Sequence, residues 1–138
     1  MRNHKAALAL ASATALVALA GCETVGEEVN EAVGFEYTAM LAPAAGGSGS
    51  GKAEISLNDA TNTICVDLEL SGVNMTGGHI IGPDGTAVDD IEVPADNDSE
   101  DCDAVSDTVI DGIKANPGAY RVHIAASTGD LWGTLRKE

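Results

Sequence analysis

Few residues of this chain could do chemistry. The three cysteines are Cys22, Cys65 and Cys102. Of the three histidines, only His79 and His123 lie beyond the first 21 residues. Neither histidine stands in a recognisable nucleophile motif such as G-x-S-x-G. A hydrolase is therefore the least favoured class of function, and no catalytic set of residues is predicted.

The first cysteine follows a leader of 21 residues. Arg2 and Lys5 form its basic start, and the apolar run 6–20 has the length of a signal-peptide core but is short for a membrane span. The run ends in the letters LAGC, which look like a bacterial lipobox. We expect cleavage before Cys22, acylation of its thiol and stable attachment to a membrane through two or more acyl chains. The alternative is an ordinary secretory signal followed by a chance cysteine.

Lipidation would place the mature chain outside the cytoplasm, anchored in the cell envelope. Glu23, rather than Asp, follows the cysteine, which in a Gram-negative cell fits the outer membrane, facing the periplasm or the surface. Residues 22–34 form the lipidated cysteine and a tether. The apolar spacing of the tether fits a short amphipathic helix, and its length fits a plain spacer equally well.

The mature chain is strongly acidic. Arg2 and Lys5 leave with the leader, so 5 of the 7 Lys and Arg residues remain against 22 Asp and Glu, a formal charge of −17. Such a surface repels nucleic acid and anionic lipid headgroups, so neither is expected as a partner. The acidity fits a solvated surface, in a salty habitat for example, or cation binding.

Residues 35–138 are predicted to form one β-domain. Alternating apolar residues indicate strands over 35–41, 52–57, 63–70, 79–81, 86–94, 119–125 and 131–136, with hairpins joining the second to the third and the sixth to the seventh. Segments 71–78 and 95–103 are predicted loops. Residues 104–115 have helical spacing, with Asp103 or Ser106 as the N-cap. The expected fold class is all-β, an antiparallel sandwich or barrel with one short helix.

Cys65 and Cys102 remain once Cys22 is used by the lipid. An even pair in an oxidising compartment predicts a disulfide, which would close a loop of roughly 38 residues and stabilise the fold by about 4 kcal/mol. A metal-binding pair is the alternative, but no Cys-x-x-Cys or neighbouring histidine supports it. The acidic segment 95–103 offers oxygen ligands for calcium without the spacing of an EF-hand loop, and a solvated loop is the alternative.

Residues 79–83, 120–125 and 129–135, taken in this order, together resemble the CHRD domain, a module first recognised in chordin and widespread in bacterial envelope proteins. Family members carry an H-I-H-G-P run, a Y-V-N-V-H-T-A strand and a G-G-x-I-R-G-Q-L end. Residues 79–83 (HIIGP), 120–125 (YRVHIA) and 129–135 (GDLWGTL) stand in these places, and the resemblance covers about 35–135. It implies an immunoglobulin-like arrangement of strands.

The chain departs from the family pattern at its histidines. Ile81 replaces the second histidine of H-I-H, so a three-histidine cluster in the family would retain here only His79 and His123. Two imidazoles need an added carboxylate to make a zinc or copper site, and Asp84 or Asp130 could supply it. The alternative is that both histidines hydrogen-bond backbone groups and hold strands together.

Two functions follow from these observations. The first is a non-enzymatic, membrane-anchored envelope lipoprotein whose CHRD-like domain binds a protein or a surface ligand, with no resident cofactor. The second is a metal-binding envelope protein or metalloenzyme that uses His79 and His123 for zinc or copper.

Overall fold

The computed structural model describes residues 34–94 and 100–138. The predicted leader, Cys22 and the tether up to residue 33 lie outside these ranges, as do residues 95–99 of the predicted acidic loop. Within the described ranges, no helix is both long enough and apolar enough to cross a membrane.

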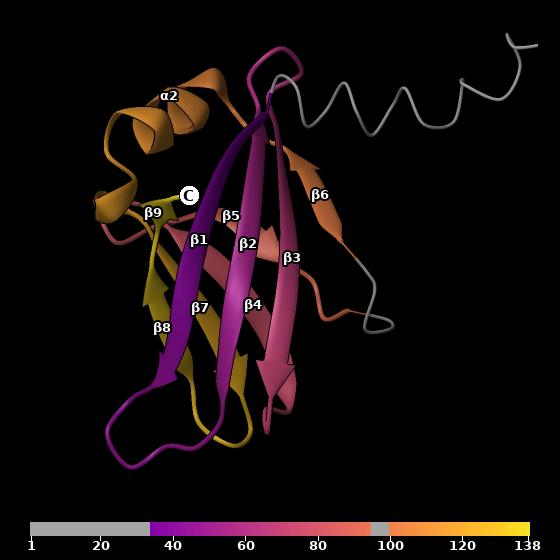
Figure 1. The fold of residues 1–138 in the computed structure, drawn as a ribbon, viewed down its shortest axis with the longest axis vertical. Helices are drawn as coiled ribbons and strands as arrows, with labels where there is room; N and C mark the ends of the chain where they lie inside the picture. Colours follow the sequence, from indigo (N-terminus) through magenta and orange to yellow (C-terminus); the bar gives the residue numbers. More distant parts are fainter. Residues whose placement is uncertain (1–33, 95–99) are drawn as a thin grey trace, which may run out of the picture.

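The described chain is built mainly of strands (Figure 1). Nine strands form one sheet, and the helix α2 and a 3-10 turn lie between β6 and β7. The strands are β1 (Gly34–Pro43), β2 (Ser50–Asn58), β3 (Thr63–Ser71), β4 (Met75–Ile81), β5 (Ala87–Ile91), β6 (Asp101–Ala104), β7 (Arg121–Ala126), β8 (Leu131–Thr134) and β9 (Arg136–Lys137). Helix α2 spans Asp107–Ala115, and the 3-10 turn η1 spans Pro117–Ala119.

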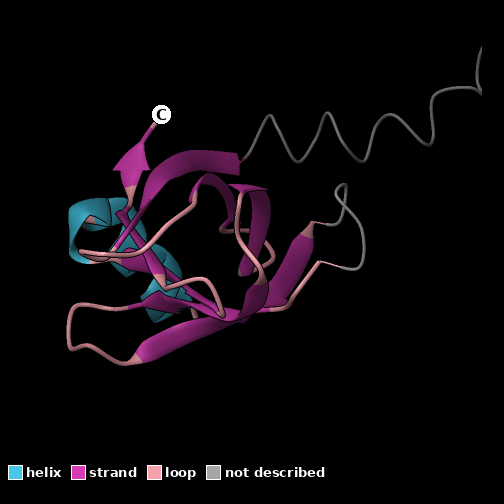
Figure 2. Cartoon of the chain, turned by 90° about the horizontal axis from the view of Figure 1, so that it is seen from below, coloured by secondary structure: helices cyan, strands magenta, loops and turns pink. Residues whose placement is uncertain are grey.

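Every strand pairing is antiparallel, in the order β5-β4-β7-β8-β1-β2-β3-β6, with β9 beside β1. Seen from below, the sheet curls around a shared interior (Figure 2). It forms a nearly closed, barrel-like structure, so the predicted all-β antiparallel fold with one short helix is confirmed. The two edge strands, β5 and β6, flank the remaining opening. The backbone N–H of Glu92, just beyond β5, donates to Asp101 Oδ2 of β6 at 2.9 Å and joins the two sides.

The core follows from the alternation of apolar residues along each strand. Successive side chains of a strand point to opposite faces, so one apolar set per strand faces the interior. Helix α2 contributes Ile110 and Ile113 from its own apolar side. The largest fully buried side chains are Tyr37, Ile55, Leu57, Ile64, Val66, Ile80, Ile110, Ile113, Val122, Ile124, Leu131 and Leu135.

Several element boundaries predicted from the sequence are wrong: β5 ends at Ile91 rather than at Pro94, and β7 begins at Arg121 rather than at Ala119. Three further differences affect the sites. Residues 75–78 belong to β4 rather than to a loop, because the two glycines there pair with β7. The strands lie close together at this point: an ideal Cβ at Gly78 would lie 3.1 Å from the His123 carbonyl oxygen. Residues 101–104 form β6 instead of a loop and a helix start, since Cys102 pairs with Cys65 on β3. The helix therefore begins only at Asp107, where the Ser106 hydroxyl caps it by accepting from the Val109 N–H at 3.4 Å.

Gly133 of β8 is a position where a side chain should not fit. An ideal Cβ would lie 2.5 Å from the Met40 carbonyl oxygen and 3.0 Å from Leu41 Cδ2. We expect Gly133→Ala to lower the free energy of unfolding by about 1–3 kcal/mol, because the backbones of β8 and β1 must separate. Gly77→Ala is the matched control, since an added Cβ there meets no atom within 4 Å. Equal midpoints for both variants in urea would contradict this account.

Candidate functional site

The register of the sheet places His79 and His123 directly opposite each other on β4 and β7. Their neighbours Ile80 and Val122 are also partners, and both are fully buried. Because side chains alternate between the two faces, the two histidines point away from the core. The sheet therefore brings together on its outer face two histidines that are 44 positions apart in the sequence.

Each histidine ring is held by a carboxylate. His79 Nδ1 lies 2.8 Å from Asp90 Oδ1 of β5, and His123 Nε2 lies 2.9 Å from Asp130 Oδ2. The hydrogen bond to His123, and then that from the Ala126 backbone N–H, lower the pKa of Asp130. Asp130 is therefore held in its charged form, and both rings are fixed in orientation.

The two histidine rings and the Trp132 ring of β8 form a row of stacked rings across three strands. The centroids of His79 and His123 are 6.1 Å apart, and those of His123 and Trp132 are 4.1 Å apart in a stacked pair. The Arg121 guanidinium carbon lies 4.6 Å from the centroid of the Trp132 ring, within cation–π range. We call the whole set the histidine face; it comprises His79, Asp90, Arg121, His123, Asp130 and Trp132.

The two carboxylates considered as added metal ligands lie in different surroundings. Asp130 does contact a histidine, but Asp84 does not: its carboxylate accepts from the Thr86 N–H at 3.0 Å and from the Thr86 hydroxyl at 2.7 Å. These two bonds lower the pKa of Asp84. Asp90 was missed, because the pairing of His79 with Asp90 depends on the register between β4 and β5. The alternative to a metal site named backbone groups as the partners of the histidines, whereas both rings contact side-chain carboxylates.

The histidine face brings two imidazoles together without a third converging ligand in the described part of the chain. Each histidine uses one ring nitrogen for its carboxylate, which leaves His79 Nε2 and His123 Nδ1 as the remaining ligand atoms. In the described part of the chain, Cys65, Glu100 and Cys102 are the one group of three possible ligands whose donor atoms all lie within 4.8 Å of one another. Both sulfurs of that group belong to a disulfide, so the group is a cross-link rather than a ligand set.

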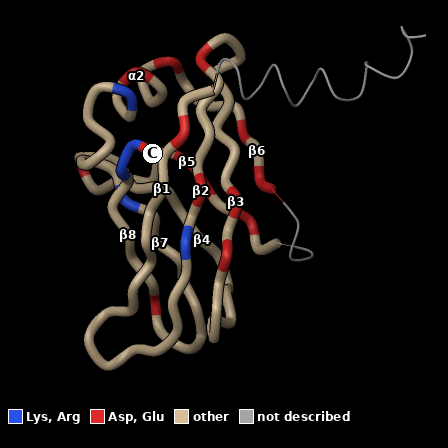
Figure 3. The backbone as a smooth tube through the Cα atoms, viewed as in Figure 1, with Lys and Arg blue, Asp and Glu red and all other residues tan. Residues whose placement is uncertain are grey.

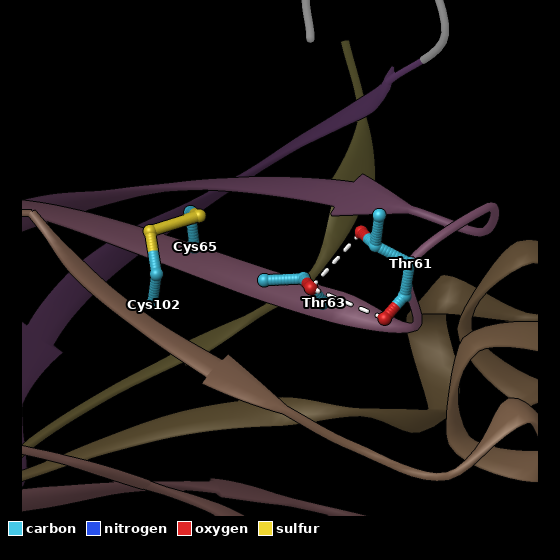
Figure 4. Close-up of a disulfide and its surroundings, with 4 residues drawn as sticks. All are labelled: Thr61, Thr63, Cys65 and Cys102. Atoms are coloured by element: carbon cyan, nitrogen blue, oxygen red, sulfur yellow. Dashed lines mark hydrogen bonds between the residues drawn. A yellow bond between two sulfur atoms is a disulfide. The ribbon is translucent and has the colours of Figure 1, made fainter.

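That disulfide joins Cys65 and Cys102, as predicted (Figure 4). The two cysteines are direct partners on β3 and β6, with their Cα atoms 4.0 Å apart. The alternative prediction, that the two cysteines bind a metal, is therefore wrong for this structure, because both sulfurs are used in the disulfide. Four residue pairs join β6 to β3, so the disulfide is a large part of what holds this edge strand.

A second group of titratable residues lies at the opening between β5 and β6. Asp89 of β5 is only 9% exposed. Its burial raises its pKa to about 7, and the negative charges of Asp103, Asp101 and Asp90 add to the shift, while the Asp90 backbone N–H opposes it. Acidic residues recur along β3 and β6 in Figure 3. Among its described residues, this opening therefore gathers several carboxylates without an interleaved basic residue.

Comparison with known proteins returns no match. No protein family, no curated protein and no solved structure matches this chain. The resemblance to the CHRD domain therefore stays a prediction, and the sites are described from the residues of this chain alone.

Proposed function

We propose that this protein is a non-enzymatic, lipid-anchored lipoprotein of the bacterial cell envelope whose β-domain binds a protein or a surface ligand through the histidine face. The observation that carries the proposal is the outward-facing row of stacked rings on the adjacent strands β4, β7 and β8. A solvent-facing sheet surface normally carries independent polar side chains. Here tryptophan and arginine, the residues enriched in binding hot spots, pack together beside two oriented histidines.

The arrangement of the rings suits binding because they are already ordered. Carboxylates hold His79 and His123, and Trp132 is held between His123 and Arg121. A ligand that contacts this face therefore immobilises few additional side chains, which lowers the entropic cost of association. The flat rings favour a partner that presents aromatic or apolar groups, with polar groups at its edge to meet Asp90 and Asp130.

We also propose that the domain is of the CHRD type. The three segments that carry the resemblance, 79–83, 120–125 and 129–135, supply the neighbouring strands β4, β7 and β8. The histidines of the first two segments, His79 and His123, are partners on one face, and Trp132, which stands where family members carry arginine, pairs with His123. Motifs that are separate in the sequence thus converge on one surface, which supports a shared role for them.

Site-specific cross-linking in the cell envelope tests the binding proposal. A photo-reactive residue replaces Thr134, which is exposed and pairs with Arg121 beside the histidine face. We expect a discrete cross-linked product that disappears when Trp132→Ala is added. The matched control places the same residue at Glu69 on β3, away from this face, where no such product should form. Equal products from both positions, or a product that survives Trp132→Ala, would overturn the proposal.

The lipid anchor has a separate test. We expect Cys22→Ser to abolish incorporation of labelled palmitate and to release the protein from the membrane fraction, because the serine hydroxyl is not a substrate for lipobox acylation. Cell fractionation and mass spectrometry of the N-terminal peptide measure both effects. Unchanged membrane association of the serine variant would contradict the proposed anchor.

Zinc or copper binding at the histidine face is the second candidate function. It is favoured by the carboxylate on each imidazole, since histidines that ligate metals commonly donate their other ring N–H to such a group. We expect zinc or copper(II) to raise the melting midpoint by mass action, and either His79→Ala or His123→Ala to remove that shift. Asp84→Asn is the control, because Asp84 contacts Thr86 instead. A shift that persists in both histidine variants would exclude the site.

A further inference from the structure

The alternation along β5 and β6 sends carboxylates toward the interior of the barrel. Asp89 pairs with Ile80 of β4, which is fully buried. On the other side of the opening, Asp103 pairs with Ile64 and Asp101 pairs with Val66, two further core residues. Partners in a sheet share a face, so all three aspartates face inward from the two edge strands.

Asp89 lacks the partners that a buried carboxylate requires. It is 9% exposed, and in the described ranges no side chain donates a hydrogen bond or forms an ion pair with it. The charges that act on it are the like charges of Asp103, Asp101 and Asp90, and its hydrogen-bond donor is the Asp90 backbone N–H. A buried ionised group without a counter-charge is strongly unfavourable, so this carboxylate calls for a positive partner.

The residues around Asp89 leave space for such a partner. A hollow of about 570 Å³ lies between β5 and the segment 103–106 at the end of β6, and its polar lining is Asp89, Asp90, Glu92, Asp103 and Ser106. The lining contains no Lys or Arg. The five basic residues of the described chain are engaged elsewhere or lie on β9; they are Lys52, Lys114, Arg121, Arg136 and Lys137.

We propose that this hollow binds a divalent cation of the hard, oxygen-liganded class, with Ca²⁺ as the best fit and with Asp89 and Asp103 as its protein ligands. Carboxylate oxygens on two facing strands suit a cation that accepts six to eight oxygen ligands in flexible geometry. Water completes the coordination, since three carboxylate ligands do not converge here. Two protein ligands in an open hollow correspond to binding of about 0.1–1 mM, the range of extracellular calcium modules.

Asp101 is not a proposed ligand, unlike Asp89 and Asp103, because its carboxylate is used in a hydrogen bond. Its Oδ2 accepts the Glu92 backbone N–H at 2.9 Å, and it lines the neighbouring hollow with Ile91 and Val93. This bond ties the end of β5 to β6 and sets the width of the opening.

The proposed cation site adjoins the histidine face, because Asp90 lines the hollow and also contacts His79 at 2.8 Å. Its proposed ligands Asp89 and Asp103 are not part of that face. The cation site goes beyond the proposed binding function and does not depend on it.

Calorimetric titration of the full-length chain with CaCl₂ tests the proposal, in chelator-treated buffer at constant ionic strength, with MgCl₂ in parallel. We expect saturable Ca²⁺ binding that weakens at least about tenfold in Asp89→Asn and in Asp103→Asn. Asp67→Asn is the matched control, since Asp67 lies on β3 at the position after inward-facing Val66 and loses the same charge. The histidine variants should bind Ca²⁺ as the wild type does.

Three results would overturn the proposal. They are the absence of saturable Ca²⁺ binding up to about 10 mM, unchanged affinity in both ligand variants, and an equal loss in Asp67→Asn, which would indicate general screening of the acidic surface. The inward carboxylates would then serve only to prevent the edge strands from pairing with other chains. Circular dichroism in chelator checks that each variant is folded. If Asp89→Asn does not fold, the Ca²⁺ affinity of Asp103→Asn alone tests the proposal.

Discussion

Replacing both Cys65 and Cys102 by serine is expected to lower the free energy of unfolding by about 4 kcal/mol. The bond links positions 37 apart in the sequence, so its loss releases a long loop in the unfolded chain. It also removes the cross-link that holds β6, an edge strand with only four paired residues along β3. Urea denaturation of the oxidised wild type and of the double variant measures the effect.

Two controls separate the cross-link from the serine substitutions. Reduction of the wild type should reproduce the loss, and reductant should leave the double variant unchanged. Hydrogen exchange should show that the amides of β6 lose protection first, because the main sheet contacts of the other strands are retained. A double variant as stable as the oxidised wild type would show that the sheet alone holds β6 in place.

Asp89→Asn is expected to raise the free energy of unfolding by about 2 kcal/mol at pH 8 in the presence of chelator. The substitution removes a buried charge that its neighbours repel. A pKa displaced from 3.8 to about 7 corresponds to at most about 4 kcal/mol, and access of solvent to the hollow reduces this figure. Thermal or urea melts of both proteins give the difference.

The same carboxyl gives the wild type a characteristic dependence on pH. The folded state holds a proton on Asp89 up to about pH 7, whereas the unfolded chain releases it near pH 3.8. The folded state therefore binds more protons between these values, and stability falls as the pH rises from about 4 toward 8. Besides burial, the negative charges of Asp103, Asp101 and Asp90 raise the pKa of Asp89.

The dependence of the wild type's unfolding free energy on pH, measured in chelator, must be compared with that of Asp89→Asn. Other groups titrate in the same pH range, and the comparison removes their contribution. We expect the difference between the two proteins to grow with pH and to vanish below about pH 4. Added Ca²⁺ should stabilise the wild type and leave the variant unchanged if the cation site is correct. A constant difference across the pH range would show that burial of Asp89 does not control stability.

The sequence by itself determined the type of fold and several of its elements. The alternating runs 52–57 and 63–70 pair as β2 and β3, and the last two predicted strands pair as β7 and β8. The pairing of Cys65 with Cys102 also followed from counting cysteines. These features are local, or they leave a single possible partner, so periodicity and composition are enough to predict them.

Only the tertiary structure decided which residues meet. His79 contacts Asp90, and Asp89 faces Asp103, because of strand registers that no local pattern encodes. A shift of one residue in β5 would exchange the roles of Asp89 and Asp90, and would turn a buried carboxylate outward. The histidine face and the hollow lined by Asp89 and Asp103 are therefore products of long-range pairing. The sequence alone offered His79 and His123 as candidate metal ligands or as strand-holding residues, and predicted a charged loop.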